Sequence, residues 1–329
     1  MRPSFVLSLL SLAHNTYALR WFSLTEKGAS SDPSTHSLAL YPLPAVYLPG
    51  STCTLKNIEP RNVAMAREQS TFVASLLDSD RKQCAEIAAV LRIDDVRAAS
   101  ADTSGRVLAS CESSTALQVQ CTVLGRARLI RCDNLAAWET RETYLIAEVS
   151  NYDDDDVSTE DTQLQNDVED AVYRLVDALL EGEENTGIDV HATVDALEEA
   201  ALHVSSGCWW EALELWQRHC STRAMAMRAE HLTERNEFLI DAKLRQGGML
   251  QIPVQEHTLP AEDRKKLLDL DQRAAEALDQ MGLDDVETFQ ACLEARSTTV
   301  RAKRLLEGVL REAGRLERRL ALQRALKSS

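Results

Sequence analysis

The spacing of apolar residues changes near residue 160, and this change is what most constrains the fold. Before it, short runs are rich in β-branched residues or alternate apolar with polar ones, as in residues 116–124. A period of two predicts β-strands. After it, apolar residues recur at helical spacing, as at Val168, Val172 and Leu179. We therefore predict an α+β chain, with a small β domain followed by an all-α helical region.

Length and composition indicate where the domains begin and end. A chain of 329 residues has room for about two domains. We expect a β domain over residues 37–150, an acidic linker over 151–160 and a helical region over 161–329. The pattern predicts strands at 85–93, 106–111, 116–124, 126–132 and 143–150, a turn at 102–105, a turn or bulge at Gly125 and a helix at 62–77. Farther on it predicts helix breaks at 182–187 and 247–253 and a last helix from about 286 to 326.

Charge is distributed unevenly along the chain. The formal net charge is −16, and residues 151–200 contain 17 acidic residues and one basic residue, Arg174. Residues 295–329 reverse the sign, with ten basic and three acidic residues. Nonspecific nucleic-acid binding depends on basic residues that neutralise phosphates, so the acidic balance argues against a nucleic-acid partner. We expect the basic tail to meet the acidic middle of the chain, or an acidic partner.

The amino terminus has the pattern of a secretory signal: Arg2, an apolar run over residues 5–13, and small residues up to Ala18. The apolar run is too short to span a bilayer. We expect a signal peptide at 1–18 and a Ser/Thr-rich, transit-like leader at 19–36, which together resemble the bipartite leaders of proteins in secondary plastids. This predicts a plastid location and no membrane segment in the mature form, with secretion or an endomembrane lumen as the alternative.

The eight cysteines are scattered and include no CxxC pair, which disfavours a zinc ribbon or a dense disulfide framework. We interpret most of them as small buried apolar groups in a reducing compartment.

Residues 40–62, LYPLPAVYLPGSTCTLKNIEPRN, place four prolines around an apolar run. Prolines 42, 44 and 49 remove donors from a strand ladder, which predicts an edge or bulged strand. Gly50 suits a turn with positive φ. Pro60 fits the first turn of a helix, where Glu59 is favoured by the helix dipole and Arg61 can pair with a carboxylate. A structural brace is the more common role for such charges.

Three short motifs in this stretch resemble the Lon protease N-terminal domain family, also called the LON substrate-binding domain. They are YPLP at 41–44, LPG at 48–50 and IEPR at 58–61. Residues 84–132 and TYLIAEV at 143–149 resemble later parts of the same domain, so the likeness covers about 37–156. The resemblance implies a PUA-like β pseudo-barrel that binds polypeptide substrates.

The motifs of the enzymatic Lon modules are absent from the sequence. It has no GxxxxGK[ST], the phosphate-binding loop of such ATPases. His219 and Cys220 are adjacent, so on a helix they point about 100° apart and do not share a metal site. Trp209 and Trp216 are seven residues apart and are expected to fill a helical core. We therefore expect no catalysis, no cofactor and no metal.

We predict a polypeptide-binding protein, an adaptor or chaperone-like factor in plastid protein quality control. An edge strand can accept an extended peptide by β-augmentation, so the candidate partners are unfolded or client polypeptides, with a protease complex as a further partner. The candidate binding residues are Tyr41, Leu43, Val46, Leu48, Glu59 and Arg61. The alternatives are an RNA-binding PUA-like module that uses the basic tail, or a component of an ATP-dependent protease system. For the last helix, a short hairpin with the preceding helix and a dimerising or partner-binding helix both remain open.

Overall fold

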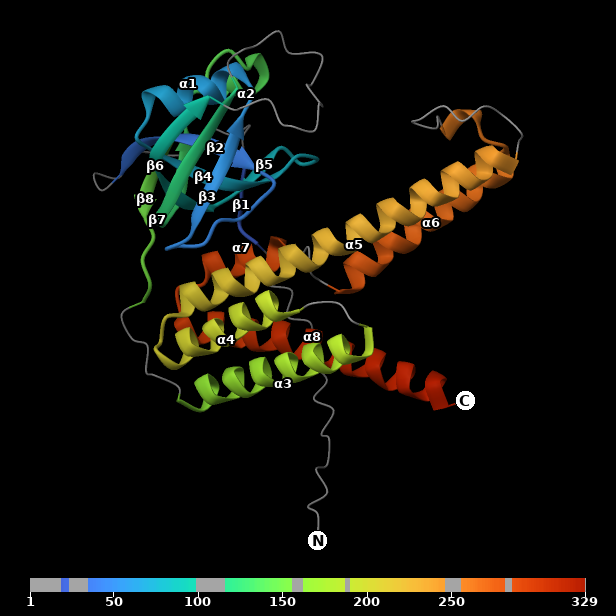
Figure 1. Ribbon diagram of the computed structural model, residues 1–329. Coiled ribbons are helices and arrows are strands. Elements are labelled where there is room, and N and C mark those ends of the chain that lie inside the picture. The colour runs from blue at the N-terminus through green and yellow to red at the C-terminus, as the bar shows by residue number, and fades with distance from the viewer. Residues whose placement is uncertain are drawn as a thin grey trace.

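The computed structural model describes residues 19–23, 35–98, 116–155, 162–186, 190–245, 256–281 and 286–328. The expected signal peptide, most of the transit-like leader, the strand at 106–111, the turn at 102–105 and the break at 247–253 lie outside these residues. A sheet domain packs against a bundle of helices, and a long two-helix arm projects from the bundle (Figure 1).

The strands are β1 (Trp21–Ser23), β2 (His36–Leu43), β3 (Thr52–Asn57), β4 (Thr71–Asp78), β5 (Gln83–Ala85), β6 (Ile87–Ala98), β7 (Leu117–Cys132) and β8 (Leu145–Asn151). β4 pairs with β2, β2 with β8, β8 with β7, β7 with β6, and β6 again with β4. The ladder therefore closes into a small barrel, with β3 added along β7 and β5 and β1 added beyond β4. The PUA-like character of this barrel remains a prediction.

The first strand lies inside the segment expected to be a transit-like leader. Trp21 pairs with Ala85, and Ser23 with Gln83. The ring of Trp21 also packs against the core between the sheet and the helices. These leader residues are thus part of the fold described here.

β7 is one long strand where two were expected, and its bulge is the predicted feature near Gly125. Val90 pairs with Gly125, whereas Leu91 pairs with Val123, so Leu124 is the extra residue on β7. Residues 117–123 alternate buried and outward-facing side chains. The bulge lets β7 continue past a bend, so that one strand pairs with β6 along one side and with β3 and then β8 along the other.

The helix expected at 62–77 is wrong in its second half. α1 (Pro60–Glu68) is capped by Gln69, and residues 71–78 form β4, which pairs in parallel with β2. Five consecutive residues of β4 are buried. A continuous apolar run of this length is compatible with either a buried strand or a helix, which is why its period did not distinguish them.

The second half of the chain is helical, as predicted. Its helices are α3 (Thr162–Thr186), α4 (His191–Ser205), α5 (Trp209–Arg245), α6 (Ala261–Met281), α7 (Val286–Glu294) and α8 (Thr298–Ser328), and a short α2 (Ala136–Thr140) lies in the sheet domain. The single last helix expected from 286 is two helices, separated at residues 295–297. α5 and α6 pair in the projecting arm (Figure 1), around Leu239, Leu259 and Leu267.

α8 packs on α3, so the basic tail does meet the acidic middle of the chain. Val309, Ala313 and Leu320 of α8 are buried in the helical core. At the surface, Arg324 pairs with Glu181, and Arg174, the one basic residue of the acidic segment, pairs with Glu317. Of the two alternatives left open for the last helix, the short hairpin with the preceding helix is not what forms, because α8 packs mainly on α3. Because Val309, Ala313 and Leu320 are buried in this way, they are not available to a dimer interface.

A clasp of two buried arginines and one partly exposed carboxylate joins the sheet to the helices, and the carboxylate comes from the expected acidic linker. Asp154 accepts hydrogen bonds from Arg126 of β7 (2.5 Å) and Arg301 of α8 (2.7 and 2.6 Å). The Arg301 guanidinium lies 4.3 Å from the centre of the Trp210 ring. Burial would raise the pKa of Asp154, but the hydrogen bonds and charges of the two arginines outweigh it and lower that pKa. Gln290 of α7 adds a buried contact to the carbonyl of Ile87, at 2.8 Å.

Within the described part of the chain, no helix is long and apolar enough to cross a membrane. Of the described cysteines, most are buried, as expected from the sequence: Cys84, Cys121, Cys132, Cys220 and Cys292. Cys53 and Cys208 are partly exposed.

Candidate functional site

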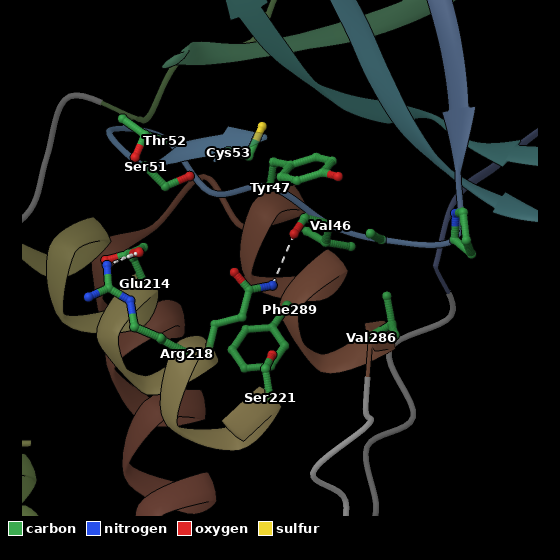
Figure 2. A pocket seen from close by; sticks show the side chains of 13 residues that line it. Val46, Tyr47, Ser51, Thr52, Cys53, Glu214, Arg218, Ser221, Val286 and Phe289 are labelled. Atoms are coloured by element: carbon green, nitrogen blue, oxygen red, sulfur yellow. Dashed lines mark hydrogen bonds and ion pairs between the residues drawn. The ribbon is translucent and has the colours of Figure 1, made fainter. Parts of the chain in front are cut away.

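A pocket of about 400 Å³ lies where the sheet domain meets the helices. One wall is the segment after β2, and the other walls are α5 and α7 (Figure 2). The lining residues are Pro44, Ala45, Val46, Tyr47, Ser51, Thr52, Cys53, Glu214, Gln217, Arg218, Ser221, Val286 and Phe289. A volume of this size suits a small molecule or a few residues of an extended chain.

Prolines and a glycine shape the sheet-side wall. β2 ends at Leu43, and residues 44–48 continue without belonging to a strand. The chain then reverses at Gly50, whose φ of 84° is in the left-handed region that glycine tolerates. Ser51 closes this turn twice, because its amide (3.1 Å) and its hydroxyl (2.7 Å) both donate to the carbonyl of Leu48. The sequence-based prediction of a turn at Gly50 is thus confirmed.

The helical wall presents a polar face of α5. Glu214, Gln217, Arg218 and Ser221 are spaced by three and four residues, so they lie along one side of the helix. Gln217 donates from its side-chain amide to the carbonyl of Val46 at 3.0 Å and so joins the two walls. Arg218 donates to Glu214 at 2.6 Å (Figure 2). This ion pair leaves the wall polar without a large net charge.

Tyr47, from the segment before β3, and Cys53 of β3 lie side by side at the rim of the pocket (Figure 2). Burial raises the pKa of the Tyr47 hydroxyl, so the ring stays neutral. Cys53 lies directly opposite Cys121 of β7. A hydrogen bond from Cys121 lowers the pKa of the Cys53 thiol, against the opposing effects of burial and Asp94, while the same contact raises the pKa of Cys121.

The structure does not bring the predicted binding residues together on one surface. Tyr41 and Leu48 are buried, and Leu43 packs half-buried against the barrel core. The side chain of Val46 is buried too, although its residue lines the pocket and its carbonyl faces α5. The Tyr41 hydroxyl donates to the buried Asn57 side chain at 3.0 Å, which indicates a structural role.

β2 is not the edge strand predicted from its prolines. Residues 36–40 pair with β8 on one side, and residues 39–43 pair with β4 on the other. Pro42 is compatible with this position because the pairing to β8 stops at Leu40. β2 therefore has neighbours on both sides at Ala39 and Leu40, whereas residues 41–43 pair only with β4.

Glu59 and Arg61 lie at the start of α1, away from the pocket residues. The Arg61 guanidinium pairs with Glu59 at 2.8 Å and lies 6.0 Å from the centre of the Trp138 ring. The predicted pairing of Arg61 with a carboxylate is confirmed. The geometry is that of a brace between α1 and α2.

The sequence did not point to the helical wall. Gln217, Arg218 and Ser221 are the polar residues of an amphipathic helix, and such faces are usually solvated. No pattern in the sequence indicated that this face meets residues 44–53, which lie more than 150 positions earlier. Trp209 and Trp216 do fill the helical core, as predicted. Among the described residues, no group of three or more histidine, cysteine or acidic side chains could hold a metal ion.

No family model and no curated protein matches this sequence. Solved structures that resemble part of the chain include the following two. One is the crystal structure of a Lon N-terminal domain protein from Xanthomonas campestris, with 24% sequence identity and a TM-score of 0.28 over 40% of this chain and 70% of that chain. The other is the N-terminal domain of the Mycobacterium avium complex Lon protease, with 12% identity and a TM-score of 0.33 over 56% of this chain and 94% of that chain.

Proposed function

We propose that this protein binds an extended polypeptide segment in the pocket between residues 44–53 and α5. The observation that carries the proposal is the composition of that pocket: apolar surface from Val286 and Phe289 beside hydrogen-bonding groups from Ser51, Gln217 and Ser221. Peptide recognition needs such a mixture, because apolar side chains need cover and backbone amides need partners.

The site proposed here is next to the predicted surface but differs from it in mechanism. The segment 40–48 contributes one wall, and a client would bind between two domains rather than add a strand to the barrel. Because the clasp around Asp154 fixes those domains against each other, the two walls hold a defined spacing. A pre-formed pocket loses little conformational freedom on binding.

Replacing Ser221 with tryptophan tests this proposal. Ser221 is exposed on α5 and lines the pocket, so a large ring there fills the space that a client would occupy. Thr222 is equally exposed, but it points about 100° away around the helix and does not line the pocket. Thr222→Trp is therefore a matched control for the added aromatic surface.

The assay is fluorescence anisotropy with labelled unfolded polypeptides and extended peptides. We expect wild type and Thr222→Trp to bind alike and Ser221→Trp to bind at least about tenfold more weakly, a loss of about 1.4 kcal/mol. Equal affinity of Ser221→Trp and wild type would place any client elsewhere. Absence of binding by the folded wild type would refute the proposed function itself.

We further propose that this activity serves protein quality control in a plastid, as an adaptor or holding factor without catalysis of its own. The leader-like residues 1–36 support the location, and fusion of that segment to a fluorescent protein tests it. Accumulation outside plastids would contradict the location and leave the binding proposal intact.

The basic tail does not favour the RNA-binding alternative. Four of its basic residues are already paired with acidic side chains of the same chain: Arg296, Arg301, Arg315 and Arg324. Phosphate binding would have to compete with these internal pairs.

A further inference from the structure

Cys53 and Cys121 occupy directly opposed positions on neighbouring antiparallel strands. They are register partners on β3 and β7, between the pairs formed by Thr52 with Thr122 and Thr54 with Gln120. Opposed residues of an antiparallel pair project to the same face, with their Cα atoms about 4.5–5.5 Å apart. Disulfides join Cα atoms about 4.4–6.8 Å apart. The backbone therefore already has the spacing that a bond between these two residues requires.

The two thiols differ in access. Cys53 is partly exposed and lines the pocket beside Tyr47 (Figure 2). Cys121 is fully buried in the barrel core, where Leu55, Val119 and Val123 are also buried. A reagent therefore has easier access to Cys53 than to Cys121.

The electrostatics assign different chemistry to each sulfur. The contact between the thiols lowers the pKa of Cys53 and raises that of Cys121, so Cys53 is the sulfur of the pair that ionises more readily. A thiolate is the form that reacts with oxidants and electrophiles. Redox-sensing cysteines combine low pKa, solvent access and a nearby resolving thiol.

We propose that Cys53 and Cys121 form a redox-active pair, in which a peroxide oxidises Cys53 at the pocket and Cys121 then closes a disulfide between β3 and β7. In the first step the Cys53 thiolate attacks one peroxide oxygen, the O–O bond breaks, and hydrogen peroxide gives a sulfenic acid and hydroxide. In the second step the Cys121 sulfur attacks the Cys53 sulfur, its proton joins the departing hydroxyl, and water leaves. The two cysteines lose two electrons, and the peroxide gains them.

The consequence lies at the pocket wall. A disulfide ties the rim of the pocket to the barrel core and removes a thiol that a client or small electrophile would meet. The oxidation chemistry itself is independent of peptide binding, so it is measured on the sulfurs and not on a ligand.

In the test, the reduced protein is treated with hydrogen peroxide and its remaining thiols are then blocked. The protein is digested without reducing its disulfides, and the peptides are mapped by mass spectrometry. We expect one peptide pair linked through Cys53 and Cys121. Cys208, which is also partly exposed and contacts the carbonyl of Ser206 at 3.9 Å, is the internal control. We expect Cys53 to react at least about tenfold faster than Cys208.

Two variants separate the steps. In Cys121→Ser, or in Cys121→Ala should the serine disturb folding, Cys53 is expected to stop at the sulfenic acid, which dimedone traps. In Cys53→Ser, Cys121 is expected to remain a thiol because it is buried. Circular dichroism establishes that each variant is folded.

The proposal is overturned if oxidised wild type lacks the link between Cys53 and Cys121. It is equally overturned if Cys208 reacts as fast as Cys53, or if Cys121 is oxidised when Cys53 is absent.

Discussion

Replacement of the buried histidine on α5 should change how stability depends on pH. His219 is 4% exposed and stacks on Trp216, with ring centres 5.1 Å apart and planes inclined by 22°. Neither of its ring nitrogens has a hydrogen-bond partner. Burial lowers the pKa of His219 from 6.5 to about 4; the charge of Glu312 opposes this shift, and the charges of Arg223 and Arg315 add to it.

The direction of the pH dependence of stability follows from which state, folded or unfolded, binds the proton more readily. Above pH 6.5 the imidazole is neutral in both states, and His219 adds no pH dependence. As the pH falls from 6.5 towards 4, the unfolded chain takes up a proton that the folded protein refuses, so stability decreases. One pKa unit corresponds to about 1.4 kcal/mol. A shift to about 4 therefore lowers the free energy of unfolding by about 2 kcal/mol between pH 7 and pH 5.

The variant His219→Leu removes this titration and the two unpartnered nitrogens. We expect it to be more stable than wild type by about 1 kcal/mol at pH 7, and by about 3 kcal/mol at pH 5. Urea unfolding followed by tryptophan fluorescence measures both values. Leu215→Ala, which truncates a buried side chain on the same helix, is the control, because it should destabilise equally at both pH values. A difference between His219→Leu and wild type that does not grow as the pH falls would refute the reasoning.

Two further substitutions test the clasp and the turn at the pocket. Asp154→Asn removes the charge shared by two buried arginines, and we expect a loss of about 2 kcal/mol in urea unfolding, reduced by screening because the Asp154 side chain is 39% exposed. Asp155→Asn, whose side chain is 63% exposed, should cost less than about 0.5 kcal/mol, and equal effects would argue against a clasp. Gly50→Ala places a side chain at a φ of 84°. We expect it to lower the free energy of unfolding by about 1 kcal/mol, which a lower midpoint of thermal unfolding would report. Gly125→Ala, where an added Cβ meets nothing within 4 Å, should be close to neutral, and the turn argument fails if both alanines behave alike.

Local sequence signals predicted the parts of this protein that depend on local chemistry. The change of period near residue 160 separated sheet from helices, Gly50 marked a turn, and Gly125 marked a bulge. Each of these follows from backbone preferences that act over a few residues, so neighbouring letters suffice to read them.

The errors arose where a distant partner decided the outcome. Residues 71–78 form a strand because β2 and β6 lie on either side of them, although their apolar run fits a helix as well. The prolines after Leu40 suggested an edge strand, but β8, about 100 residues later in the chain, pairs with the first half of β2, at residues 36–40. Asp154 belongs to an apparently solvated acidic run, yet it is the partly exposed partner of two buried arginines that lie far apart in the chain.

The sequence alone determined the order of the two structural classes, the turn at Gly50 and the burial of Trp209 and Trp216 in the helical core. Only the tertiary structure decided that the polar face of α5 meets residues 44–53 to form a pocket, and that Cys53 lies opposite Cys121. The physical reason is that periodicity and turn chemistry are properties of adjacent residues, whereas a pocket wall and a strand register are set by which surfaces the closed barrel and the helical core bury against each other.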